Sequence, residues 1–224
     1  MKNKLANIKE IYSSHPLVSI MIPTYNRPEL FEKTLQSALA QSYENIEILV
    51  NDNSTNEDTS SLIRKYECDS RLKYYRNKDA KCKEDNFRPF EHNAKGEYLQ
   101  WCMDDDILHK DKLSMMVSVM VSNPHITLTS SQRGFIDEND SFIAPRRETI
   151  IKDDVIGRGY KGNAIGNYML KEISNLIGEP SAALFRRSDL AHHYWQADCR
   201  GYKTISDVVM WLELLEKGDL FLFK

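Results

Sequence analysis

The chain has 224 residues, 41% of them hydrophobic and 28% charged, which is the composition of one globular domain with a core of its own. Its 30 Lys and Arg against 33 Asp and Glu give a net charge of −3, so no strongly basic surface for nucleic acid is expected. No apolar run approaches the roughly 20 residues that cross a bilayer, and the first 16 residues lack the pattern of a secretory signal. We therefore expect a cytoplasmic protein without a transmembrane segment.

Strand and helix patterns alternate through the first half of the chain. Short apolar runs predict strands at 17–22, 46–50, 72–75 and 98–103, and apolar residues at helical spacing predict helices at 30–39, around 62–66 and at 113–121. This β-α-β alternation predicts an α/β fold, in which a mostly parallel sheet is flanked by helices on both faces.

The second half is less regular. The patterns predict strands at 126–130 and 182–185, a turn between extended segments at 136–142, and a helix at 208–215. Residues 144–166 are charged and contain four glycines, so we expect a mobile excursion there.

An acidic cluster, Asp104, Asp105 and Asp106, directly follows the predicted strand at 98–103. Three adjacent carboxylates repel one another, and a divalent cation would offset that repulsion. Oxygen ligands suit Mg²⁺ or Mn²⁺, which keep coordination positions that a diphosphate can fill. The alternative is an acidic loop that only caps the next helix.

Two other predicted strands end in polar residues. Asp52 and Asn53 follow the second strand, and the first strand leads into Thr24, Tyr25 and Asn26, whose hydroxyl, ring and amide can hold a nucleobase. Asp52 alone could close an Asx-turn, but two acidic strand ends at one sheet edge indicate a binding site. No strand is followed by GxGxxG or a P-loop, so phosphates would be met by metal and side chains.

These motifs together resemble the family-2 glycosyltransferases of the GT-A fold. The runs VSIMIPTYNR at 18–27, ILVNDNS at 48–54 and GEY at 96–98 leading into DDD occur in the family's order, with the resemblance strongest over 17–122. The resemblance implies a Rossmann-like, mostly parallel sheet with a smaller acceptor-side region. It also implies metal-dependent, inverting transfer of a sugar from a nucleotide sugar, UDP being favoured, to a hydroxyl of a glycan, glycoprotein or surface polysaccharide.

Residue by residue, the resemblance implies nucleotide-sugar contacts from Pro23, Thr24, Tyr25, Asn26, Asp52, Asn53, Lys83, Asn86 and Asp104. It implies Mn²⁺ or Mg²⁺ ligands among Asp104, Asp105 and Asp106. An Asp-x-Asp pattern selects Asp104 and Asp106, whereas alignment on the following Ile107-Leu108 selects Asp105, so the division of roles stays open.

Asp207 opens the predicted helix at 208–215 and resembles the family's catalytic base. A carboxylate at a helix N-terminus also acts as a cap, which is the alternative role. We expect Asp207 to act as the base, because inversion requires a group that takes the acceptor's proton.

We expect three regions: an N-terminal helical extension over 1–16, a nucleotide-sugar-binding half over 17–131, and an acceptor-side half of the same domain over 132–224. Relatives usually continue with further strands, so we expect an acceptor region shorter than theirs. We expect an apolar stripe on residues 1–12 to pack against the domain, the alternative being peripheral membrane contact. The oligomeric state is left open.

Two other functions fit parts of the pattern. A nucleotidyltransferase shares the sheet and the acidic site, but it normally has a Gly-rich loop after the first strand, and residues 23–28 contain no Gly. A non-catalytic nucleotide-sugar-binding or oligomerisation module would keep the motifs without transferring sugar.

Overall fold

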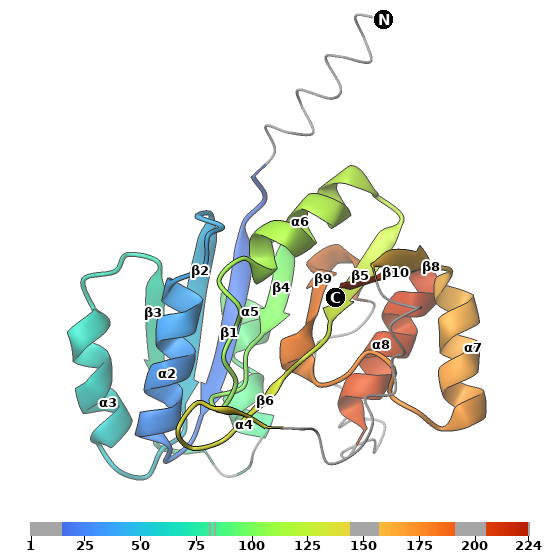
Figure 1. Cartoon of the computed structure of the whole chain (residues 1–224). Helices are drawn as coiled ribbons and strands as arrows, with labels where there is room; N and C mark the ends of the chain where they lie inside the picture. Colours follow the sequence, from blue (N-terminus) through green and yellow to red (C-terminus); the bar gives the residue numbers. More distant parts are fainter. Residues whose placement is uncertain (1–14, 81, 83, 144–156, 191–204, 224) are drawn as a thin grey trace, which may run out of the picture.

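The computed structural model describes residues 15–80, 82, 84–143, 157–190 and 205–223. They form three layers, with helices on both faces of one large sheet (Figure 1). The predicted helical extension and its apolar stripe fall almost entirely outside the described residues.

The sheet has the strand order β3-β2-β1-β4-β9-β5-β10-β8. Its strands are β1 (Val18–Thr24), β2 (Ile46–Asp52), β3 (Leu72–Arg76), β4 (Tyr98–Trp101), β5 (Ile126–Ser131), β8 (Arg158–Tyr160), β9 (Ala183–Arg186) and β10 (Asp219–Phe223). Neighbours pair in parallel except at β9 and β8, which run antiparallel to the strands beside them. The prediction of an α/β fold with a mostly parallel sheet is confirmed.

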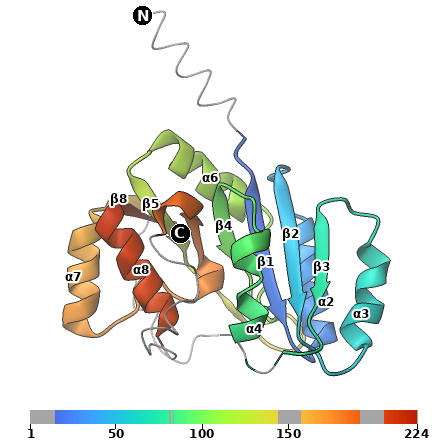
Figure 2. The same cartoon turned by 180° about the vertical axis from the view of Figure 1, so that it is seen from behind.

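The helices divide between the two faces of the sheet (Figures 1 and 2). One face carries α2 (Pro28–Leu39), α3 (Asp58–Ile63) and α6 (Lys112–Ser122), and the other carries α4 (Glu84–Phe87), α5 (Phe90–Asn93), α7 (Gly162–Glu172) and α8 (Ser206–Lys217). All residues of β1 and β2 are buried, as expected for strands covered on both faces.

Each face of the sheet has its own hydrophobic core. Phe31 and Leu35 of α2 pack with Met116 of α6 on one side. On the other side Trp101 of β4 and Trp211 of α8 are completely buried. These two cores fix β1, β2 and β4, whose carboxyl ends carry the motifs.

The region from 144 to 166 differs from the prediction where it is described. Residues 158–160 form β8, which pairs with β10, and Gly162 begins α7. A Cβ on Gly162 would lie 1.8 Å from the carbonyl oxygen of Gly218, so this glycine permits close packing of α7 on the end of α8. The glycine that suggested mobility therefore serves packing, while residues 144–156 lie outside the described part.

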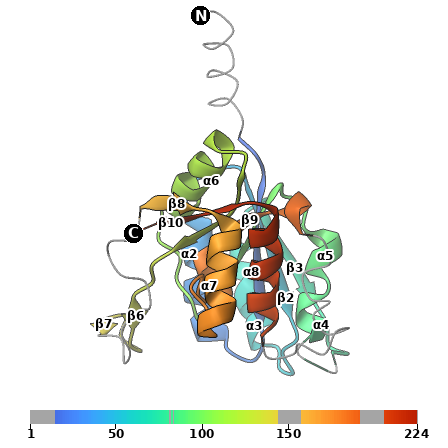
Figure 3. The same cartoon turned by 90° about the vertical axis from the view of Figure 1, so that its right-hand side faces the viewer.

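A short hairpin of β6 (Phe135–Ile136) and β7 (Phe142–Ile143) projects from the body of the domain, as Figure 3 shows. It forms the predicted turn between extended segments. Lys33 of α2 donates to Asp140 in its turn, at 2.7 Å. Within the described residues, no helix combines the length and apolarity needed to span a membrane.

Candidate functional site

The three motif-bearing loops meet at one edge of the sheet. Thr24, the last residue of β1, pairs in register with Asp52, the last residue of β2. On its other side β1 pairs with β4, after which the chain turns into the acidic cluster. In an open α/β sheet, ligands bind at this carboxyl edge.

Thr24 connects these loops. Its hydroxyl donates to Asp104 Oδ2 at 2.9 Å. Its carbonyl oxygen accepts the backbone N–H of Asn53 at 3.2 Å and the side-chain amide of Asn86 at 2.8 Å. The first loop thus holds together the segments after β2 and β4 and the helix α4.

Asp104 is almost fully buried and has a partner on each carboxylate oxygen. Besides Thr24, the backbone N–H of Tyr25 approaches Oδ2 at 3.4 Å, and the Arg27 guanidinium donates to Oδ1. Burial raises the pKa of Asp104, against the lowering effects of Arg27 and the Thr24 hydroxyl.

Asp105 and Asp106 point to different partners. Arg27 Nη1 donates to Asp105 Oδ2 at 2.9 Å, and the Asp105 side chain is half exposed. Burial raises the pKa of Asp106, opposed by a hydrogen bond to Ser181. In the described part of the chain, no three Asp, Glu, His or Cys side chains are grouped as a metal site. Two neighbouring carboxylates, Asp104 and Asp105, share one guanidinium instead.

Asn26 braces the first loop against the loop after β2. Its backbone has a positive φ of 53°, a conformation that asparagine tolerates well. Its N–H donates to Ser54 Oγ at 2.8 Å, and its side-chain oxygen accepts the Thr55 N–H at 2.9 Å. The structure therefore gives Asn26 a positioning role, while Tyr25 beside it stays half exposed.

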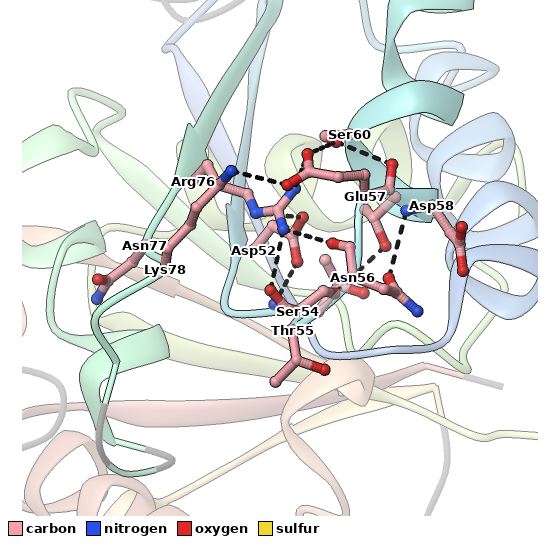
Figure 4. A network of polar contacts seen from close by, with 12 residues as sticks. Asp52, Ser54, Thr55, Asn56, Glu57, Asp58, Ser60, Arg76, Asn77 and Lys78 are labelled. Atoms are coloured by element: carbon pink, nitrogen blue, oxygen red, sulfur yellow. Dashed lines mark hydrogen bonds and ion pairs between the residues drawn. The ribbon is translucent and has the colours of Figure 1, made fainter.

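Asp52 is completely buried within a polar network, drawn in Figure 4. Its carboxylate accepts the Ser54 N–H at 2.7 Å, which is the Asx-turn considered above, and the Tyr74 hydroxyl at 2.6 Å. Arg76 Nε lies 3.7 Å from the same carboxylate. The carboxylate of Asp52 thus faces protein partners.

Arg76 holds the loop after β2 from the other side. Its guanidinium donates to the carbonyl oxygens of Ser54 and Asn56 and forms an ion pair with Glu57 at 3.1 Å (Figure 4). The loop that carries Asn53 is therefore fixed at both ends.

Three asparagine side chains near this edge keep an acceptor free. Asn51 donates to the Asn86 carbonyl at 3.0 Å, and Asn86 donates to Thr24. Among the described residues, the side-chain oxygens of Asn51, Asn53 and Asn86 are buried and have no hydrogen-bond partner. An unpartnered buried acceptor costs free energy, which a water or a ligand N–H that reaches it would offset.

Two further residues were predicted to contact the nucleotide sugar. Pro23 is buried within β1, opposite Asn51 of β2. Lys83 lies outside the described residues.

Asp207 lies in the first turn of α8, half-buried. Asn175 donates to Asp207 Oδ2 at 3.2 Å and to the Gly178 carbonyl at 3.1 Å. Trp211, one turn further along α8, also donates to that carbonyl, at 3.2 Å. The loop from 173 to 179 therefore orients the Asp207 carboxylate.

The same loop continues to the acidic cluster. Three residues after Gly178, the Ser181 hydroxyl accepts the Met103 N–H at 2.9 Å, and Ser181 also acts to lower the pKa of Asp106. Sequence reasoning did not single out Asn175 or Ser181, and it quoted Arg27 without assigning it a role. For Arg27 a signal existed, since it is a cation in the loop after the first strand.

The family model for glycosyl transferase family 2 matches residues 19–193. The chain belongs to this family. Protein CgeD of Bacillus subtilis is 25% identical to this family-2 chain over 213 residues, which are 88% of the chain and 46% of CgeD. The UDP-Glc:alpha-D-GlcNAc-diphosphoundecaprenol beta-1,3-glucosyltransferase WfgD of Escherichia coli is 31% identical over 139 residues, or 61% of the chain and 54% of WfgD. The chain thus spans about half the length of these relatives.

Solved structures share the fold. TarS residues 1–349 of S. aureus, in complex with UDP, match 92% of this chain and 57% of theirs at 14% identity, with a TM-score of 0.64. The mannosyltransferase PcManGT of Pyrobaculum calidifontis, in complex with GDP-Man and Mn²⁺, matches 94% of this chain and 55% of its own at 16% identity, with a TM-score of 0.59. The predicted GT-A fold and family membership are confirmed.

Proposed function

We propose that this chain is the donor-binding and catalytic part of an inverting glycosyltransferase that uses a nucleotide sugar and a divalent cation. Residues 17–131 would bind the donor, and residues 132–224 would supply the acceptor side and the base. The observation that carries the proposal is the meeting of Thr24, Asn53 and the buried Asp104 at the carboxyl ends of β1, β2 and β4.

The donor's base and ribose would lie against the loops after β1 and β2. The unpartnered oxygens of Asn53 and Asn86 can accept N–H groups of a base, and the exposed Tyr25 ring can stack on it. Asp52 would act by holding Ser54 and its loop in place rather than by touching the base. UDP is the nucleotide we favour.

The carboxylates fit a divalent cation of the Mn²⁺ or Mg²⁺ type. Such ions are commonly held by one or two carboxylates together with substrate phosphates, and Asp104 and Asp105 offer that donor set side by side. When bound, the cation would stabilise the charge of the departing nucleoside diphosphate. The structure of PcManGT, which holds GDP-Man with Mn²⁺, supports the same combination for this chain.

Asp207 would take the proton of the acceptor hydroxyl as that oxygen attacks the anomeric carbon. Asn175, by donating to one carboxylate oxygen, fixes the side chain and leaves the other oxygen to accept the proton. A single attack from the face opposite the leaving diphosphate inverts the anomeric centre.

For the acceptor we propose a sugar carried on a polyprenol diphosphate. WfgD and a GalNAc(5)-diNAcBac-PP-undecaprenol beta-1,3-glucosyltransferase of Campylobacter jejuni, which is 33% identical over 104 residues, act on acceptors of that kind by name. Such a lipid would bring the reaction to a membrane surface.

The test begins with thermal unfolding in UDP-glucose, UDP-GlcNAc and GDP-mannose, each with and without Mn²⁺. We expect one donor to raise the Tm, and to raise it further with Mn²⁺, because a ligand that binds only the folded state stabilises it. With that donor and a synthetic GlcNAc-diphosphate-alkyl acceptor, Asp207→Asn should lower transfer by about 10²–10⁴-fold while keeping the donor-induced Tm shift.

Glu216→Gln is the matched control, because it removes one exposed carboxylate from the same helix. It should transfer sugar at the wild-type rate. Undiminished transfer by Asp207→Asn would rule out this base, and a donor-induced Tm shift without any sugar transfer by the wild type would favour a non-catalytic binding module.

A further inference from the structure

A positive side chain already occupies the carboxylates proposed to hold the cation. Arg27 directs one guanidinium nitrogen to Asp104 Oδ1 and another to Asp105 Oδ2, the latter at 2.9 Å. Because Thr24 and Tyr25 take the other oxygen of Asp104, this buried carboxylate is surrounded by donors from the first loop alone. A cation that binds Asp104 Oδ1 therefore competes with the guanidinium for this oxygen.

The acidic pair depends on Arg27 in this arrangement. Two adjacent carboxylates, one of them buried, destabilise each other's charge unless a cation is near. Arg27 is the cation that the described residues provide to both of them. The planar guanidinium can bridge two acceptors at once, which an ammonium group does less well.

Arg27 is also free to leave without moving the loop. Its side chain is 46% exposed, whereas that of Asp104 is 3% exposed. The backbone before it is fixed by the contacts of Asn26 with Ser54 and Thr55. A side-chain rotation would therefore release the carboxylates without displacing the loop.

We propose that Arg27 is the resident counter-ion of Asp104 and Asp105, and that it exchanges these carboxylates for the donor's diphosphate when nucleotide and divalent cation bind together. This inference rests on the proposed function. Guanidinium groups bind phosphate oxygens in a bidentate manner, so the diphosphate offers Arg27 a replacement for the partners it gives up. A cation that binds alone displaces Arg27 from its carboxylate partners and gives it no new ones. A cation that binds with the diphosphate displaces Arg27 as well, but the phosphate oxygens replace the lost partners.

The consequence is a coupling between the two ligands. In the wild type Mn²⁺ alone should bind weakly, and UDP should tighten it strongly. By linkage, Mn²⁺ tightens UDP by the same factor. Without Arg27, Mn²⁺ alone should bind more tightly and the coupling should fall.

The experiment measures free Mn²⁺ by its electron paramagnetic resonance signal during titration of the whole chain, with and without UDP. We expect Arg27→Gln to tighten binding of Mn²⁺ alone by about tenfold, a typical coupling factor. The factor by which UDP tightens Mn²⁺ binding should fall at least tenfold in the same variant. Arg27→Lys keeps the charge but loses the planar guanidinium. Its affinity for Mn²⁺ alone should lie between those of the wild type and Arg27→Gln.

Lys33→Gln is the control, since it removes one positive charge from α2 that pairs with Asp140 rather than with the acidic cluster. It should leave both titrations unchanged. Thermal unfolding of each variant establishes that it is folded. If Arg27→Gln does not fold, the same titrations are made with Arg27→Lys.

Equal or weaker binding of Mn²⁺ alone by folded Arg27→Gln would overturn the inference, and so would an unchanged effect of UDP. If the wild type still binds Mn²⁺ with UDP in that case, the proposed function stands without it. If neither protein binds Mn²⁺ under any condition, the metal-dependent function fails as well.

Discussion

Lys112 places a positive charge inside the protein, close to the acidic cluster. Its ammonium donates to Ser131 Oγ and to the carbonyl oxygen of Ala182, both at 2.8 Å. Burial lowers the pKa of Lys112 from 10.5 to about 7. Lys112 joins the end of β5 to the turn before β9, and its contribution to the free energy of unfolding depends on pH.

The sign of that dependence follows from proton counts. Between about pH 7 and 10.5 the folded state has largely lost the Lys112 proton while the unfolded chain keeps it. The unfolded state then binds more protons, so the contribution of Lys112 to the free energy of unfolding increases with pH in this window and is constant below it. Lys112→Met removes this contribution.

We expect the free energy of unfolding of Lys112→Met, relative to wild type, to decline from pH 6.5 to pH 9.5, as measured by urea titration at each pH. Lys110→Met, at an exposed position two residues earlier, should show a difference that does not change with pH. A constant difference for Lys112→Met would mean that the buried ammonium keeps its ordinary pKa.

At the residue scale, the sequence predicted which segments form the site better than it predicted what each side chain does. Thr24, Asp52 and Asp104 reach one edge because they follow parallel strands, which the hydrophobic pattern reveals. Asn26 contacts the loop after β2, and Asp52 contacts Tyr74 of β3. The local pattern does not reveal these contacts, because they join residues far apart in the chain. No local pattern encodes that Arg27 meets Asp104.

At the element scale, two glycines of α7 differ in the space available for a side chain. A Cβ on Gly162 would lie 1.8 Å from the Gly218 carbonyl oxygen and 2.2 Å from that of Leu215, both backbone atoms that cannot turn aside. A Cβ on Gly166, one turn along α7, would meet Leu212 Cδ2 at 3.5 Å, an ordinary van der Waals contact. The crossing of α7 over α8 therefore needs glycine at one position only.

We predict that Gly162→Ala lowers the free energy of unfolding by about 1–3 kcal/mol, the usual cost of overpacking. Gly166→Ala should raise it by about 0.5–1 kcal/mol, since alanine favours a helix interior. Urea titration of both variants measures these changes, and the pair serves as its own control. Equal effects of the two substitutions would show that α7 can shift away from α8.

The short strand at the far edge of the sheet is one of the elements that sequence reasoning missed, together with the helices α4, α5 and α7. The predicted strands β1, β2 and β4 are rich in apolar residues, as expected for strands with both faces buried. In contrast, β8 has only three residues, Arg158–Tyr160, and becomes a strand by pairing with β10. Its charge and glycine indicated a loop, and only the tertiary pairing decides otherwise.

At the scale of the whole molecule, the chain order and the strand order do not coincide. β9, from the proposed acceptor half (132–224), lies between β4 and β5 of the proposed donor half (17–131). β5 pairs with β9 and β10, and both of these come after residue 131. The core around Trp101 likewise includes Phe185 and Trp211. The proposed donor and acceptor halves therefore share one sheet and one core.

This interleaving predicts that the proposed donor half cannot fold by itself. A fragment of residues 17–131 leaves β5 without either of its partners and uncovers the apolar side chains that pack on Trp101. Unpaired strand edges and exposed apolar surface favour aggregation. We expect the fragment to lack a near-ultraviolet circular dichroism signal from packed aromatic rings and to show no cooperative urea transition, whereas the full chain shows both. A cooperative transition in the isolated fragment would instead mean that β1 to β4 form an independent unit, and that β9 adds to a sheet already formed.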